Sequence, residues 1–303
     1  METATEPLYR LKAVDRYFRV GSAEVRAVDD VDLELYPGEL VAIEGPSGSG
    51  KSTMLQLLGA LDKPSRGSVV FDGRDLSKLD DAELTSIRAK DIGFVFQAFN
   101  LIPTLTASEN VELAMVPLKG SKAQRRQRAA ELLEAVGLSE RTRHLPSLLS
   151  GGEQQRVAIA RAMANNPRVI LADEPTGNLD SRSSEEIGTI LRSLAAEQGV
   201  TVILVTHADN VAGWAHRRLA MRDGQLTDRA DSQWKAPTAP APAPEAPAAE
   251  ALSAETPAPE TLSAETLSAE APAAEAPAPE TLSAETLAAD TLAAESHPGP
   301  AGG

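Results

Sequence analysis

The sequence contains no cysteine among its 303 residues. This excludes disulfides and thiolate chemistry, and it fits a reducing compartment. Aromatic residues are scarce, and the five Phe, three Tyr and two Trp supply no stacking platform for single-stranded nucleic acid. No apolar run approaches the roughly 18 residues of a membrane span, and the N-terminus shows no signal-peptide pattern. We therefore expect a soluble, cytoplasmic protein, in which any link to a membrane comes through a partner.

Basic residues are missing from the C-terminal part of the chain. Lys235 is the last Lys or Arg, whereas eleven acidic residues lie between Glu245 and Glu295. The net charge of −15 therefore belongs mainly to this part, and the remaining residues carry 33 acidic against 29 basic side chains, a net charge of about −4. Neither part has the basic stripe that is typical of nucleic-acid binding, so no nucleic-acid partner is expected.

The same C-terminal part is built from Ala, Pro, Glu, Ser and Thr, in units such as "PAPET", "LSAET" and "LAAES". An acidic residue falls at every fifth position, a period that suits neither a helix face nor a strand face. Such a segment cannot bury enough apolar area to offset the entropy of ordering it. We expect a disordered, acidic tail over 228–303. Two interpretations of it stay open: a repeat expansion with no specific role, or a spacer or partner-binding segment.

Residues 1–227 are expected to form one α/β domain. Apolar strands are predicted at 40–43 and 68–71 and in "RVILAD" and "VTVILVTH", with helices over 51–59 and about 182–197. Apolar strands that alternate with helices indicate a parallel sheet covered on both faces. The region 105–165 is predicted to be mostly helical, and "LAMRDGQL" is predicted to be a hairpin that turns at Asp223–Gly224.

The stretch "GPSGSGKST" follows one of these strands and opens a helix. It matches the phosphate-binding loop, in which successive backbone amides of a glycine-rich turn form an anion nest at a helix N-terminus. Lys51 can reach the β- and γ-phosphates of a nucleotide, and the Ser52 hydroxyl can bind Mg²⁺. The predicted phosphate-binding residues are Gly45, Pro46, Ser47, Gly48, Ser49, Gly50, Lys51, Ser52 and Thr53.

Two adjacent carboxylates stand at the end of the strand in "VILADEPTGNLD". The carboxyl ends of strands are where ligands bind in an open α/β sheet. We expect Asp173 to hold Mg²⁺ and Glu174 to polarise the attacking water.

A third stretch, "LSGGEQQR", starts a helix in an unusual way. Ser150 and Glu153 can form a capping box. Gly151 and Gly152 nevertheless cost about 1 kcal/mol each relative to Ala inside a helix. Amides free of side chains at a helix N-terminus suit an anion, yet the loop at 45–53 already serves the chain's own nucleotide.

With this stretch the chain resembles the ATP-binding subunits of ABC transporters, whose signature sequence "LSGGEQQR" matches. The resemblance covers about residues 8–227. It implies a P-loop ABC ATPase fold with a mixed core sheet, an N-terminal antiparallel β part and a helical subdomain at about 98–165. It also implies that Ser150, Gly151 and Gly152 contact the γ-phosphate of ATP held by another subunit, so that a head-to-tail dimer buries two ATP molecules.

Other roles are carried over from the family one residue at a time. In "GFVFQAFNLIP", Gln97 matches the glutamine that contacts Mg²⁺ and the water and faces the membrane partner. In "GNLD", Asp180 matches a residue that touches the opposite subunit. In "ILVTHAD", His207 matches the histidine that contacts the γ-phosphate. The aromatic that stacks on adenine matches Phe18 or its neighbour Tyr17.

The resemblance implies an ATPase subunit that drives a separate membrane permease, most similar to the macrolide-export and lipoprotein-release group. The dimer would be a homodimer or a pair with a similar subunit. One alternative is an ATPase coupled to a non-transport membrane process, such as extracytoplasmic signalling or the activation of a cell-wall enzyme. Related ATPases of DNA repair, chromosome organisation and translation need coiled-coil insertions or two ATPase domains, which the sequence lacks. A regulatory subunit with little turnover is disfavoured by Glu174 and His207.

Overall fold

The computed structural model describes residues 6–21 and 23–229, and the predicted tail lies outside the described residues from residue 230 onward. Asp228 ends the last strand, β10 (Gln225–Asp228), and its carboxylate accepts hydrogen bonds from Arg217 at 2.9 and 2.7 Å. The folded part therefore includes Asp228, one residue beyond the boundary expected from composition.

The predicted parallel sheet is confirmed. Its strands are apolar because both faces are covered: Thr201–Thr206 is buried throughout, and Val169–Ala172 is buried in the neighbouring strand. Among the described residues six strands form this sheet, in the spatial order β10, β9 (Arg217–Arg222), β3 (Leu40–Glu44), β8 (Thr201–Thr206), β7 (Val169–Asp173) and β6 (Ile92–Phe96). The strands β3, β6, β7, β8 and β9 run parallel, and β10 returns antiparallel to β9 through the expected turn at Asp223–Gly224.

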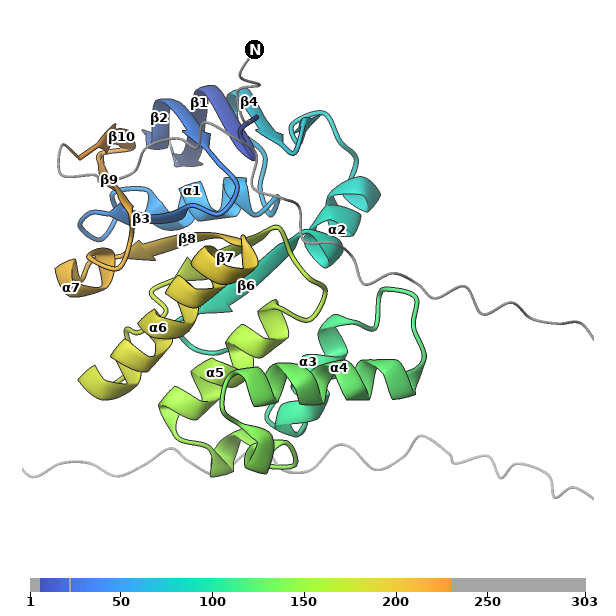
Figure 1. Cartoon of the computed structure of the whole chain (residues 1–303). Helices are drawn as coiled ribbons and strands as arrows, with labels where there is room; N and C mark the ends of the chain where they lie inside the picture. Colours follow the sequence, from blue (N-terminus) through green and yellow to red (C-terminus); the bar gives the residue numbers. More distant parts are fainter. Residues whose placement is uncertain (1–5, 22, 230–303) are drawn as a thin grey trace, which may run out of the picture. The chain divides into compact units, whose positions relative to one another are not determined.

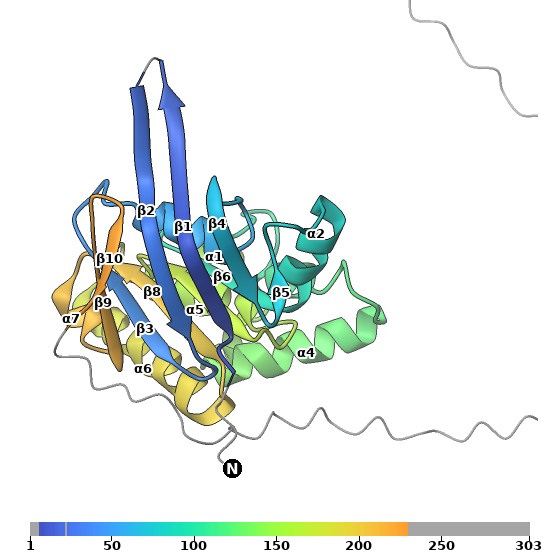
Figure 2. The same ribbon diagram turned by 90° about the horizontal axis from the view of Figure 1, so that it is seen from above.

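A second, antiparallel sheet is built mostly from the N-terminal residues, as the resemblance implied. Figure 2 shows its first two strands as a long hairpin that reaches beyond the rest of the described fold. The outer half of this hairpin is exposed from Ala23 to Arg26, whereas its inner half alternates with buried residues such as Val31 and Leu33. In spatial order the strands are β2 (Ala23–Leu35), β1 (Tyr9–Val20), β4 (Arg66–Phe71) and β5 (Arg74–Asp75).

Helix α1 (Lys51–Leu58) lies between the two sheets (Figure 1). Alternate residues of the main sheet, such as Val41 and Ile43, join α1 and the antiparallel sheet in one apolar core. The residues between them, such as Ala42, face a second core shared with the helices on the other side. The main sheet therefore separates two apolar cores, and the loop with the predicted phosphate-binding residues follows the carboxyl end of its strand β3.

The helical region is confirmed between about 105 and 165, and three of its helices start with a capping box, at Thr106, Ser121 and Ser150. None of the helices in the described ranges is long and apolar enough to span a bilayer. In chain order the helices after α1 are α2 (Asp81–Lys90), α3 (Ala107–Ala114), α4 (Lys122–Ala135), the 3-10 turns η1 (Ser139–Arg141) and η2 (Pro146–Leu148), α5 (Gly151–Ala162), α6 (Ser181–Gln198) and α7 (Asp209–Ala212).

One contact in the second core yields a stability prediction. A Cβ added at Gly188 of α6 would lie 2.5 Å from Cε2 of the Trp214 indole. Gly188→Ala should lower the free energy of unfolding by about 1–2 kcal/mol, because overpacking outweighs the gain in helix propensity. Urea denaturation measures this loss. Gly120→Ala is the matched control, since an added Cβ there meets nothing closer than 3.9 Å. Equal stability of Gly188→Ala and the unchanged protein would contradict the packing argument.

Candidate nucleotide-binding site

The predicted phosphate loop connects β3 to α1 and requires its glycines. Gly48 and Gly50 have φ angles of 79° and 106°, in the left-handed region that favours glycine. A Cβ at Gly50 would lie 1.9 Å from the Ala27 carbonyl oxygen, and one at Gly45 would lie 2.1 Å from that of Met221. The loop is thus pressed against β2 and β9 by backbone alone, and its amides are left to bind an anion at the start of α1.

Lys51 is the first residue of α1 and is largely buried, with 8% of its surface exposed. Its Nζ donates hydrogen bonds of 2.8 Å to the carbonyl oxygens of both Gly45 and Pro46. The ammonium group is therefore folded back over the loop, within reach of a phosphate bound there.

The two carboxylates meet this loop from β7. Burial raises the pKa of Asp173, and the neighbouring Glu174 carboxylate raises it further, while Lys51 and a hydrogen bond to Ser52 oppose the rise. A bound cation would relieve the repulsion between the two acids.

Glu174 adopts a strained backbone, with φ of 46° and its amide donating to the Val205 carbonyl at 2.9 Å. Its Oε1 lies 2.7 Å from His207 Nδ1, and its Oε2 accepts a hydrogen bond of 3.2 Å from Thr206 Oγ1. The ends of β7 and β8 thus bring together the predicted base and the predicted histidine. The Glu174 side chain is 16% exposed and that of His207 is 67% exposed, so the histidine remains open to a ligand.

These groups line one pocket of about 410 Å³, within the size range of small-molecule sites. Gln97, one residue beyond β6, lies in the same pocket. It is held by Asn178, which accepts from Gln97 Nε2 at 3.2 Å and donates to the Gln97 carbonyl at 3.0 Å. Asn178 was missed by sequence reasoning, although it lies in the "GNLD" segment. The lining residues are Ala27, Ser47, Gly48, Gly50, Lys51, Ser52, Thr53, Gln97, Asp173, Glu174, Val205 and His207.

The signature residues stand apart from this pocket, and neither Ser150, Gly151 nor Gly152 is among its lining residues. The predicted capping box is confirmed: Ser150 Oγ accepts from the Glu153 amide at 3.3 Å, and Glu153 Oε2 accepts from the Ser150 amide at 2.8 Å.

The two glycines also have a packing reason that the sequence did not reveal. A Cβ on Gly152 would lie 2.8 Å from Ser183 Oγ in α6, and one on Gly151 would lie 3.3 Å from a Leu179 methyl. Asp180 caps α6 by accepting from the Ser183 amide and hydroxyl, and it too lies outside the lining of the pocket.

Comparison with known proteins places this arrangement in a family. Residues 28–177 match the family model described as "ABC transporter". The chain is 51% identical over 223 residues to the uncharacterized ABC transporter ATP-binding protein MJ0796 of Methanocaldococcus jannaschii, over 72% of this chain and 95% of that protein. The chain belongs to the ABC transporter family. It is an ATP-binding cassette of that family, and the reaction of such cassettes is ATP hydrolysis.

Two further comparisons describe its relatives. The macrolide export ATP-binding/permease protein MacB of Wolinella succinogenes is 50% identical over 226 residues, or 75% of this chain and 35% of that protein. The cassette thus spans about a third of the length of the macrolide-export relatives it matches. A dimeric structure of MJ0796 in a post-hydrolysis state, bound to ADP and Pi, superposes with a TM-score of 0.67 at 48% identity, covering 73% of this chain and 98% of that one.

The structure places the two candidate aromatics of the cassette on opposite faces of β1, since side chains alternate along a strand. Phe18 pairs with Val25, and both are exposed, at 38% and 50%. Ala27, two residues from Val25, lines the nucleotide pocket. Phe18 is the more exposed of the two aromatics, since Tyr17 is only partly exposed, but it is not among the residues that line the pocket. The Arg16 guanidinium lies 4.6 Å from the centre of the Phe18 ring.

The donor set of the cassette suits Mg²⁺. Within 6–21 and 23–229 no cluster of three or more His, Cys, Asp or Glu could hold a metal by itself. Mg²⁺ commonly takes one or two carboxylates and completes its shell with phosphate oxygens and water. The hydroxyl of Ser52, the carboxylate of Asp173 and the amide oxygen of Gln97 are hard oxygen donors beside the phosphate loop, so the residues present fit this ion.

Proposed function

We propose that this cassette hydrolyses ATP at a site shared by two copies of the chain, and that closure of the pair drives a membrane permease. One observation carries the proposal: the phosphate loop, Gln97, Asp173, Glu174 and His207 line one pocket, whereas the signature residues do not. Ser150 is exposed at the N-terminus of α5, a helix end whose backbone amides suit an anion. The nucleotide pocket of the same chain does not include the signature residues in its lining. A second copy in head-to-tail orientation would present its nucleotide to these amides.

In this proposal each residue of the pocket has one task. The loop amides and Lys51 bind the β- and γ-phosphates, and Phe18 stacks on the adenine. Ser52, Asp173 and Gln97 would hold Mg²⁺, which neutralises charge on the phosphates when it is bound. Glu174 orients the attacking water and accepts its proton. His207, already 2.7 Å from Glu174, donates to the γ-phosphate on the same side of the pocket.

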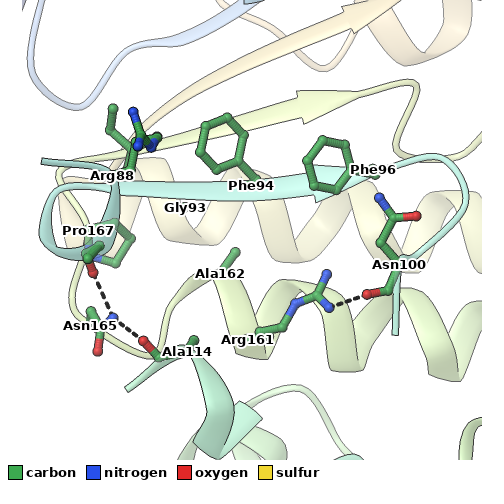
Figure 3. Close-up of a pocket in the computed structure, with 12 residues that line it drawn as sticks. Arg88, Gly93, Phe94, Phe96, Asn100, Ala114, Arg161, Ala162, Asn165 and Pro167 are labelled. Carbon is green, nitrogen blue, oxygen red and sulfur yellow. Dashed lines mark hydrogen bonds between the residues drawn. The ribbon is translucent and has the colours of Figure 1, made fainter. Parts of the chain in front are cut away.

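The permease would dock in a groove of about 350 Å³ between β6, α2, α3 and the end of α5 (Figure 3). The rings of Phe94 and Phe96 lie parallel there, with centres 5.8 Å apart. Close in sequence to Ala114, which lines the groove, Leu113 and Val116 are exposed apolar residues, at 42% and 56%. The groove and the nucleotide pocket are adjacent along the chain, because Phe96 lines the groove and the next residue, Gln97, lines the nucleotide pocket. We assign it to a cytoplasmic segment of a permease of the macrolide-export type.

A charge placed on this surface should separate permease binding from ATP hydrolysis. Leu113→Asp in the tagged full chain should prevent copurification of a multi-span membrane protein from detergent-solubilised membranes, because a buried unpaired carboxylate is costly. Its basal ATPase rate should stay within about twofold of the unchanged chain, as expected for a surface substitution. Ala196→Asp, at an exposed position of α6, is the matched control and should still bind the permease. Copurification of the same permease with Leu113→Asp would reject this docking surface.

A further inference from the structure

The four residues that follow β6 form a strained turn between the groove and the nucleotide pocket. Phe99 and Asn100 are consecutive non-glycine residues with positive φ angles, of 59° and 49°. Residues of this kind persist only where surrounding contacts hold them. The turn also carries Gln97, so its conformation fixes the backbone from which that amide extends toward Asn178.

Arg161, in the last turn of α5, provides such contacts. Its Nη1 donates to the Asn100 carbonyl at 2.5 Å (Figure 3), and its Nη2 donates to the Phe99 carbonyl at 2.9 Å. Both bonds go to backbone carbonyls, and burial lowers the pKa of the guanidinium. A planar fork with two parallel donors fits two successive carbonyls in a way that a point charge such as Lys cannot.

The same helix begins with the signature. Gly151 and Gly152 form the first turn of α5, and Gln155 in the second turn is fully buried, with its Nε2 donating to the Pro175 carbonyl at 2.6 Å. Pro175 directly follows Glu174. Helix α5 therefore carries the signature glycines at its start. Further along it contacts Pro175, next to Glu174, and at its end it contacts the turn that follows Gln97.

We propose that Arg161 is a positioning residue for Gln97: its guanidinium holds the turn at 98–100 so that α5 and the Gln97 amide move together when two copies close on ATP. This inference rests on the role proposed above for Gln97. It goes beyond it by naming the side chain that holds the turn after Gln97 and the helix to which that turn is attached, while Asn178 contacts Gln97 directly.

The first test is Arg161→Lys in the full chain, which keeps the charge but loses the fork. We expect kcat for ATP hydrolysis to fall about tenfold, because a small misplacement of a positioned group has large effects on rate. KM for ATP should change less than about twofold, since the phosphate loop is untouched. Amide exchange at Phe99 and Asn100 should accelerate while the core of α5 stays protected. Arg128→Lys is the matched control, because Arg128 also braces a left-handed residue, Asn166, away from the pocket.

A double-mutant cycle shows whether Arg161 acts through Gln97. Gln97→Ala alone should lower kcat, and adding Arg161→Lys should lower it no further. Arg161→Gln, which is neutral and also cannot span both carbonyls, should repeat the result if the Lys variant folds poorly. Wild-type kcat in Arg161→Lys, or a full additional loss on top of Gln97→Ala, would overturn the inference. Unchanged kcat in Gln97→Ala would instead remove Gln97 from the proposed mechanism, and the positioning role of Arg161 with it.

Discussion

Glu174→Gln should reduce ATP turnover at least about a hundredfold while ATP binding is retained, as expected when a positioned general base is lost. The amide keeps the size of the side chain and can still contact Thr206 and His207, so the pocket should keep its shape. It cannot accept a proton from water. Steady-state phosphate release measures the loss, and equilibrium binding of ATP measures what remains.

The same substitution should also trap two chains around unhydrolysed ATP, because closure needs binding and reopening needs hydrolysis. Size-exclusion chromatography with ATP should show a dimer for Glu174→Gln that the unchanged chain forms only transiently. Glu134→Gln, an exposed acid on α4, is the control and should leave turnover and assembly unchanged. If Glu174→Gln turns over ATP at the normal rate, another group is the base.

The second large effect is a rescue between two inactive variants. Lys51→Ala should lose ATPase activity because its own loop no longer holds phosphate. Ser150→Arg should lose it because the bulky side chain covers the signature amides. When the two are mixed, half of the random dimers combine both defects in one shared site and leave the other site intact. If the sites work independently, activity should return to about a quarter of the unchanged protein, as symmetry of a two-chain assembly requires.

Ser150→Thr is the control for the helix cap, because Thr keeps the hydroxyl and loses little capping energy. It should retain activity, which would show that Ser150→Arg acts by bulk rather than by unravelling α5. If the signature served the nucleotide of its own chain, every chain in the mixture would carry one defect at its own site. No recovery above either variant alone would then be seen.

The core of this fold could be predicted from the sequence because its strands are buried on both faces. Continuous apolar runs such as Leu40–Ile43 and Val169–Ala172 predict strands in the interior of a covered sheet. The glycines of the phosphate loop predict a backbone so close to its neighbours that a side chain would collide with them. The outer half of the β1–β2 hairpin could not be predicted, because it faces solvent and lacks an apolar period. Its strands are held by backbone pairing such as Phe18 opposite Val25.

The site was predictable to the extent that motifs mark it, whereas contacts between distant segments were not. Lys51, Asp173, Glu174 and His207 follow from spacing and resemblance, and the structure brings them into one pocket. Arg161 donates hydrogen bonds to two carbonyls that lie 61 and 62 residues earlier in the chain. The local sequence pattern of neither segment predicts this contact.

The close packing of Gly152 against Ser183 could not be predicted from the sequence either. The sequence suggested only an anion-binding role for the glycines after Ser150. The structure shows in addition that Gly152 lies close to Ser183 of α6, which limits the size of the residue at this position. Packing against α6 and the proposed anion role require the same thing, a residue without a side chain.

The account depends most on the claim that two copies share each nucleotide. A disulfide between Ser47→Cys on one chain and Ser150→Cys on another tests this claim directly, in the Glu174→Gln background that retains ATP. Both positions are exposed, and the chain has no native cysteine to compete. With differently tagged chains, the shared site predicts an interchain product that forms with ATP and is absent without nucleotide. An intrachain product when both cysteines are on one chain, or an interchain yield that does not respond to ATP, would contradict it.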